Sequence, residues 1–169
     1  MLRIRVYSNW LISFETSRVP FIVKVKIPLT ETDTEIEIRK IDIEHLDEVF
    51  QFLQPFMKQN FLLPREKDEV KTLMTHGFAA FHAEQIVGFA AVEIYSRKLG
   101  ELQCLAVDPN YRRLGIAKKL VNKCCEVATE TGVKELMAIS ASDELFMACG
   151  FEYSLPNQKR ALFFQPDQD

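Results

Sequence analysis

The stretch that most constrains the fold is residues 101–120, "ELQCLAVDPNYRRLGIAKKL". Its first residues are apolar enough for a buried strand. The dipeptide Asp108-Pro109 then predicts a turn, and the apolar side chains that follow Gly115 recur at helical spacing. Two arginines and a glycine stand where this helix begins. The stretch therefore predicts a strand, a turn and an amphipathic helix, with an unusual junction between strand and helix.

The rest of the chain predicts a mixed sheet with helices on its faces, an α/β fold. Asp42 is a candidate cap for the first helix, which we expect to bend or end at Pro55. A tight turn is expected at Glu84-Gln85. In chain order, the expected elements are a strand at 35–40, a helix from 43, a helix from about 66, two strands within 77–96, a strand at 101–107, a helix at 115–130, a strand at 134–140, a helix at 142–149 and a last strand at 161–165.

Residues 1–34 are expected to lie outside the main domain, which spans 35–169. A strand is expected within "VPFIVKVKI" at 19–27, and the polar linker "PLTETDTE" follows it. The role of this N-terminal extension is unknown from the sequence. We expect no signal peptide, because Ser8 and Asn9 break the first apolar run early.

Composition excludes several classes of protein. A length of 169 residues suits one main domain, and a net charge of -3 argues against a general nucleic-acid binder. No apolar run approaches the length of a membrane span. The four cysteines form no CxxC pair and the three histidines are scattered, so neither a metal site nor disulfides are expected. These features favour a reducing cytoplasm.

The junction "YRRLGIA" has the chemistry of an anion site. The first turn of a helix leaves backbone N–H groups without partners and carries partial positive charge. Gly115 permits close approach of a ligand, while Arg112 and Arg113 supply charge-assisted hydrogen bonds. A pyrophosphate fits there, and a turn with solvated arginines is the alternative. The patterns GxxxxGK[ST] and GxGxxG are both absent, which argues against a nucleotide-hydrolase or dinucleotide loop.

Arg112-x-x-Gly115-x-Ala117 resembles the Q/R-x-x-G-x-G/A motif of the GNAT superfamily of N-acetyltransferases, and "ACGF" at 148–151 resembles the C-terminal "GF" of that family. The resemblance covers about residues 35–165. It implies the GNAT fold, with splayed central strands and helices on both faces, and acetyl-CoA as co-substrate without a metal. The implied acetyl-CoA contacts are Leu105, Ala106, Val107, Arg112, Arg113, Leu114, Gly115, Ile116 and Ala117. Ala117 stands where many members have glycine.

Glu101 is the candidate general base, because it opens the predicted central strand and an attacking amine must lose a proton. Glu93 is the weaker alternative, and an exposed carboxylate at a strand end is the plainer interpretation. The family's usual proton-donating tyrosine is replaced by Phe146. The substitutes considered for it are Ser140, our candidate catalytic residue, and Ser142 and Tyr153. Departure of the thiolate without a dedicated acid is a further alternative.

A second resemblance concerns the acceptor. "GELQCLAVDPNYRRLGIAKKL", "NFLLPREKDEV" and "SLPNQKRALFF" are similar to the acetyltransferase domain of N-acetylglutamate synthases. This implies that Arg65 binds a substrate carboxylate and that Lys159 or Arg160 binds a second one. A surface role beside acidic neighbours is the alternative for Arg65. The amino-acid kinase domain of the longer synthases is absent here, and the chain ends short of the basic tail that many of them have.

The leading hypothesis is direct transfer of acetyl from acetyl-CoA to a small amine such as glutamate, in a ternary complex. A protein or peptide N-acetyltransferase and a non-catalytic acyl-CoA sensor are the alternatives. No cysteine lies where a nucleophile is obviously activated. Because members of the family are often dimers, a homodimer is a candidate assembly, and neither nucleic acid nor membrane is an expected partner.

Overall fold

A computed structural model describes residues 3–7, 11–16, 19–21, 35–140 and 142–153 of the chain. The chain separates into two compact units, Met1–Thr34 and Glu35–Asp169. In the first unit, strands β1 (Arg3–Tyr7), β2 (Leu11–Thr16) and β3 (Val19–Phe21) form an antiparallel sheet in that order. Sequence patterning predicted strand only around the third of these, so β1 and β2 are additional.

The second unit contains the α/β arrangement that the sequence predicts. Three short 3₁₀ turns, η1 (Ile43–His45), η2 (Met74–His76) and η3 (Pro109–Tyr111), lie between its main elements. Those elements are β4 (Glu37–Lys40), α1 (Leu46–Lys58), α2 (Lys67–Leu73), β5 (Gly77–His82), β6 (Gln85–Ile94), β7 (Leu99–Val107), α3 (Ile116–Glu130), β8 (Glu135–Ala138) and α4 (Glu144–Met147).

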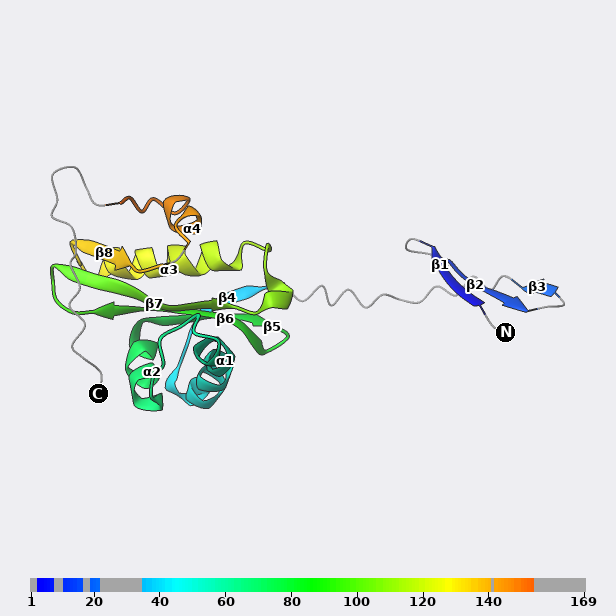
Figure 1. Cartoon of the computed structure of the whole chain (residues 1–169), viewed down its shortest axis with the longest axis horizontal. Helices are drawn as coiled ribbons and strands as arrows, with labels where there is room; N and C mark the ends of the chain where they lie inside the picture. Colours follow the sequence, from blue (N-terminus) through cyan, green and yellow to red (C-terminus); the bar gives the residue numbers. More distant parts are fainter. Residues whose placement is uncertain (1–2, 8–10, 17–18, 22–34, 141, 154–169) are drawn as a thin grey trace. The chain divides into compact units, whose positions relative to one another are not determined.

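Within the described residues of this unit, five strands form one mixed sheet in the order β4-β5-β6-β7-β8. The first four are antiparallel neighbours, and β8 runs parallel to β7. Figure 1 shows this sheet nearly edge-on, with α1 and α2 on one face and α3 and α4 on the other. The parallel pair requires a crossover, and α3 provides it.

Each face of the sheet has its own apolar core. Val49 and Leu53 of α1 pack with Phe89 of β6 on one face. On the other, Leu120 and Val121 of α3 pack with neighbouring residues of the sheet. Alternation along the strands explains the division, since successive side chains point to opposite faces. The apolar stripe predicted for the helix after Gly115 is confirmed, because its members Ile116, Leu120, Val121, Cys124, Val127 and Ala128 are buried.

The sheet opens between β7 and β8, which is the last strand of the described sheet. Within the described residues, β8 pairs with β7 only from Leu99 to Leu102, so β7 continues beyond its neighbour. The register between β6 and β7 also shifts here, because Ala91 faces Gln103 while Phe89 faces Ala106. The extra residue on β7 makes a bulge. Its centre is Cys104, which has φ +55°, an uncommon conformation for a residue other than glycine.

Several boundaries differ from the sequence prediction. Helix α1 continues past Pro55 to Lys58. The turn between β5 and β6 lies one residue earlier than expected, at Ala83 and Glu84, and both residues have positive φ. The predicted strand at 161–165 and most of the predicted strand at 19–27 lie outside the described residues.

Candidate active site

The loop from η3 to α3 forms one side of the site. Gly115 is the N-cap of α3 and adopts a left-handed backbone with φ +75°, and Arg113 has φ +65°. A Cβ at Gly115 would meet no heavy atom within 4 Å, so no neighbouring atom requires a glycine here. The glycine instead permits the left-handed backbone and leaves space for a ligand to approach. Arg112 and Arg113 are exposed. Within the described part of the chain, neither guanidinium forms an ion pair, so both are available to an anion at the start of α3.

One contact fixes the turn before this loop, and a second ties the loop to the sheet. Asp108 accepts a hydrogen bond from the Asn110 N–H over 2.8 Å, which fixes the turn. The hydroxyl of Tyr111 lies 3.1 Å from Nδ1 of His82 on β5, and the two rings are tilted against each other. This loop, residues 112–115 between η3 and α3, is the candidate anion loop, and a side-chain pair anchors it to the sheet.

The three β7 residues expected to contact acetyl-CoA lie beyond the last residue that β8 pairs with. Ala106 pairs with Phe89 of β6. The Asp108 N–H bonds the Val87 carbonyl on β6, so by strand alternation the backbone groups of Val107 point the other way, toward the opening. Leu105 follows the bulge directly. The backbone groups of Val107 thus face the opening, whereas those of Ala106 face β6.

Glu101 lies on the α1/α2 face of the sheet and is 8% exposed, the one charged side chain in the buried set of the described residues. Its Oε2 accepts a hydrogen bond from the Tyr95 hydroxyl over 2.6 Å. Glu93 stands directly opposite Glu101 on β6, with its Oε2 3.3 Å from the same hydroxyl. The plainer interpretation of Glu101, an exposed carboxylate at a strand end, does not hold, because the residue is buried.

Arg65, in the loop between α1 and α2, reaches the same face. Its Nη2 donates to Oε1 of Gln103 over 2.7 Å, and its Nη1 lies 3.9 Å from Oε1 of Glu69. The Arg65 side chain is only 15% exposed, so it is more than a surface loop residue. A guanidinium has five N–H donors, which leaves several for a ligand.

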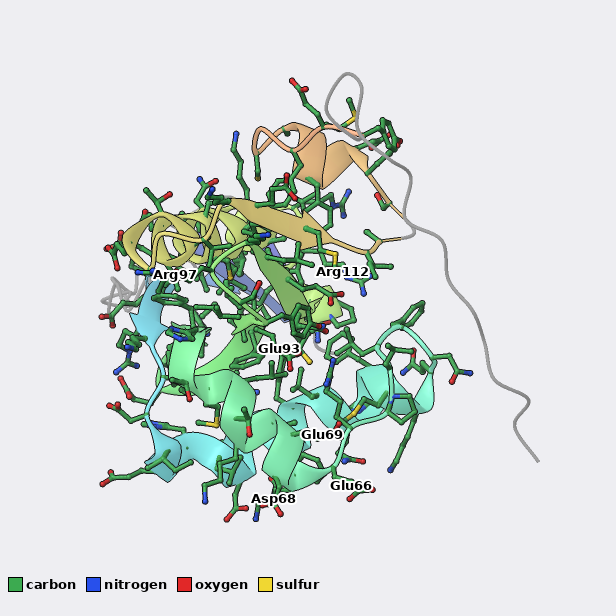
Figure 2. All side chains as sticks on the ribbon, turned by 90° about the vertical axis from the view of Figure 1, so that its left-hand side faces the viewer. Glu66, Asp68, Glu69, Glu93, Arg97 and Arg112 are labelled. Atoms are coloured by element: carbon green, nitrogen blue, oxygen red, sulfur yellow. The ribbon has the colours of Figure 1, made fainter. Side chains whose placement is uncertain are left out.

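Figure 2 shows Glu93 near the centre of the view, with Arg112 and Glu69 on opposite sides of it.

Cys104 does not have the properties of a nucleophile. Burial raises the pKa of its thiol, and the nearby Arg65 guanidinium offsets only part of that effect. A reactive cysteine needs its thiolate form, which burial disfavours. The four cysteines are all free.

Comparison with known proteins identifies the fold. The profile of the acetyltransferase (GNAT) family matches residues 41–151, most of the chain. The chain belongs to the GNAT family. The amino-acid acetyltransferase of Photorhabdus laumondii is 27% identical over 133 residues, which cover 75% of this chain and 30% of that protein. The chain therefore spans less than a third of this curated relative.

Solved structures agree on the GNAT fold. N-acetylglutamate synthase from Neisseria gonorrhoeae, complexed with coenzyme A and N-acetyl-glutamate, superposes with a TM-score of 0.60 and 23% identity, over 68% of this chain and 27% of that one. An aminoglycoside acetyltransferase from a soil metagenome, in complex with sisomicin, gives 0.56 and 24% identity, over 81% of this chain and 100% of that one. At these identities the likeness concerns the fold.

The remaining candidate residues of this GNAT domain, including Phe146 at the usual donor position, lie in different surroundings. Phe146 is buried against Phe151, with ring centroids 5.3 Å apart, and belongs to the core. Ser140 follows β8, but its hydroxyl donates to the Ser142 carbonyl over 2.7 Å and accepts from the Ser142 N–H over 3.0 Å. Tyr153 is exposed. Lys159 and Arg160 lie outside the described residues.

Sequence patterning missed Tyr95, Gln103 and Glu69. Gln103 could have been found from strand alternation, since it follows Glu101 by two residues and faces the same side. Tyr95 could not have been found in this way, because only the hairpin between β6 and β7 brings its hydroxyl to Glu101. Among the described residues, no group of His, Cys, Asp and Glu side chains is placed to hold a metal ion. None of the described helices is long and apolar enough to cross a lipid bilayer.

Proposed function

We propose that this chain transfers the acetyl group of acetyl-CoA to the amine of a small, amino-acid-like acceptor, with Glu101 as general base. The observation that carries the proposal is the opening between β7 and β8. We propose that it leads from the anion loop at the start of α3 to the face of the sheet where Glu101 and Arg65 make their hydrogen bonds. The fold of a family whose relatives bind coenzyme A supports acetyl-CoA as the donor.

The reaction follows from these positions. Arg112 and Arg113 hold the pyrophosphate at the start of α3, and the acyl arm enters the opening beside β7. Glu101 takes a proton from the acceptor ammonium, and the neutral amine then attacks the thioester carbonyl. A backbone N–H of β7 stabilises the oxyanion. The C–S bond then breaks, and the departing thiolate takes up the second proton that the attacking nitrogen loses, so that coenzyme A leaves as the free thiol. Since Cys104 keeps its proton, acetyl passes directly between the substrates.

The acceptor proposal rests on Arg65. Its guanidinium is largely buried, is oriented by Gln103 and keeps free donors for a carboxylate. The relatives named amino-acid acetyltransferase, and the neighbour solved with N-acetyl-glutamate, make glutamate the first acceptor to test. An aminoglycoside enzyme with the same fold is the reason to test other amines beside it.

The test is release of free thiol from acetyl-CoA by the full chain, against a panel of amino acids, polyamines and short peptides. We expect turnover with glutamate and a fall in kcat of about 100-fold for Glu101→Gln, the usual range for loss of a general base. Acetyl-CoA affinity, measured by calorimetry, stays unchanged in that variant. Turnover with another amine but not with glutamate overturns the acceptor, and peptide-only turnover favours a protein acetyltransferase.

A second candidate function is a non-catalytic acyl-CoA sensor. One observation favours it: Phe146 has no proton to donate and the Ser140 proton is engaged by Ser142. The two functions differ in a measurable way. Tight binding of acetyl-CoA without thiol release for any amine of the panel supports the sensor and overturns the transferase.

A further inference from the structure

A chain of hydrogen bonds links the candidate acceptor anchor to the candidate base. It runs from Arg65 to Gln103 over 2.7 Å, from Gln103 to Tyr95 over 3.3 Å and from Tyr95 to Glu101 over 2.6 Å. Its members come from the α1–α2 loop, from β7 and from the hairpin between β6 and β7, so the tertiary fold assembles it.

The chain has one direction. A guanidinium only donates, so the Gln103 atom that faces Arg65 is Oε1, and the amide Nε2 is left to face Tyr95. The Tyr95 oxygen therefore accepts from Gln103. Its single proton then goes to Glu101 Oε2 at 2.6 Å rather than to Glu93 Oε2 at 3.3 Å. Every donor in the chain points toward Glu101.

We infer that Tyr95 and Gln103 are positioning residues, which hold one oxygen of Glu101 and leave the other, Oε1, to receive the proton of the acceptor amine. This inference rests on the proposed function. Among the described residues Oε1 makes no hydrogen bond, which fits that role. When the amine loses its proton, Oε1 gains it, and no proton needs to move along the chain.

The state of the Tyr95 hydroxyl supports this role. Burial of the hydroxyl, together with the hydrogen bond and charge of Glu101, raises the pKa of Tyr95 to about 12. The hydroxyl therefore remains a donor at neutral pH. The Tyr95 residue as a whole is 50% exposed, so removal of its hydroxyl leaves the apolar core intact.

Two substitutions break the chain in different ways. Tyr95→Phe removes the donor to Glu101 and keeps the ring. Gln103→Glu keeps an oxygen for Arg65 but offers only acceptors, so the Tyr95 proton turns toward residue 103 and Glu101 loses its donor. We expect each variant to lower kcat roughly tenfold, since misplaced catalytic groups cost rate rather than affinity. The KM for acetyl-CoA and the melting temperature should stay at wild-type values.

The double variant decides between a shared chain and separate effects. If both residues act through the Tyr95 hydroxyl, Gln103→Glu causes no further loss of kcat in the Tyr95→Phe background when the acceptor is saturating. Arg97→Gln, an exposed change in the same hairpin, is the matched control and should behave as wild type. Rates are measured by thiol release with the best acceptor of the panel.

Three outcomes overturn the inference: Tyr95→Phe with wild-type kcat, single effects that multiply in the double variant, or losses confined to the KM for acetyl-CoA. These outcomes require an active wild-type chain. Absence of thiol release from wild type with every amine is a different result, because it overturns the proposed function itself and, with it, the positioning role.

Discussion

Gly115 and Gly132 lie at the two ends of α3 and share one backbone conformation, with φ +75° and +71°. A Cβ at either position would meet no heavy atom within 4 Å. They differ in their surroundings, because Gly115 adjoins the arginine loop and Gly132 follows the far end of the helix. Substitutions at these two positions therefore distinguish the conformational role of a glycine from its role in letting a ligand approach.

We expect Gly115→Ala and Gly132→Ala to destabilise the fold by similar amounts, about 1 kcal/mol each, because a side chain disfavours positive φ. Only Gly115→Ala should also weaken acetyl-CoA binding, since its methyl group stands where the pyrophosphate approaches. Urea unfolding measures the first effect and calorimetry the second. Equal acetyl-CoA affinity in the two variants contradicts the pyrophosphate site.

The pKa of the Tyr95 hydroxyl predicts how the free energy of unfolding changes at alkaline pH. Its pKa is raised from an ordinary 10.0 to about 12, so the folded chain holds this proton more tightly than the unfolded chain does. The resulting stability is fully present below pH 10 and is lost as the pH rises through 12. We expect the free energy of unfolding of Tyr95→Phe to fall less steeply than that of wild type across this interval.

The pKa of Tyr95 also tests directly whether its hydroxyl donates to Glu101. Glu101→Gln removes a hydrogen-bonding carboxylate and its charge, both of which raise the pKa of Tyr95. Burial, the largest cause of the raised pKa, remains, so the pKa of Tyr95 should fall below its wild-type value of about 12 without returning fully to 10. NMR of labelled tyrosine, assigned with Tyr95→Phe, measures this shift. An unchanged titration means that Tyr95 does not donate to Glu101.

At the scale of elements, the site depends on how loops and strands are held together. The anion loop between β7 and α3 is tied to β5 through the Tyr111 and His82 side chains. Strand β7 is bent by its bulge at Cys104, and β8 leaves it after Leu102. These features set the spacing between the loop that we propose to hold pyrophosphate and the face that carries the proposed base.

We expect Tyr111→Phe to weaken acetyl-CoA binding several-fold, because loss of a hydrogen bond of about 1 kcal/mol loosens the loop. His82→Ala should have a similar effect. In the double variant the losses should not add, since both changes remove the same contact. Calorimetry with acetyl-CoA measures all three, and additive losses mean that the pair does not act as one anchor.

At the scale of the whole molecule, residues 1–34 and 35–169 form separate compact units. We expect a fragment of residues 35–169 to fold, with a melting temperature and acetyl-CoA affinity close to those of the full chain. Circular dichroism and calorimetry test this. Failure of the fragment to fold means that the N-terminal unit contributes to the stability of the GNAT unit. The homodimer and the cytoplasmic location stay predictions.

Much of the GNAT unit could be predicted because its signals are local. The stretch from Glu101 to Leu120 shows its strand, turn and helix directly, and the buried stripe of α3 follows its apolar periodicity. Helix α2 begins where its capping box, formed by Glu66 and Glu69, satisfies the first backbone groups. Of the two outcomes expected at Pro55, a bend or an end of α1, the end is wrong, because the helix continues to Lys58.

The sequence by itself determined the fold class and indicated the candidate anion loop and the candidate base, since each depends on residues close together in the chain. Only the tertiary structure decided what surrounds that base. Tyr95 and Gln103 reach Glu101 because β6 and β7 pair, and Arg65 arrives from a distant loop. The tertiary structure also showed that Phe146 belongs to the core and that the Ser140 hydroxyl donates to the Ser142 carbonyl. Periodicity reports which face a residue takes, whereas hydrogen-bond partners depend on distances that only the packed chain sets.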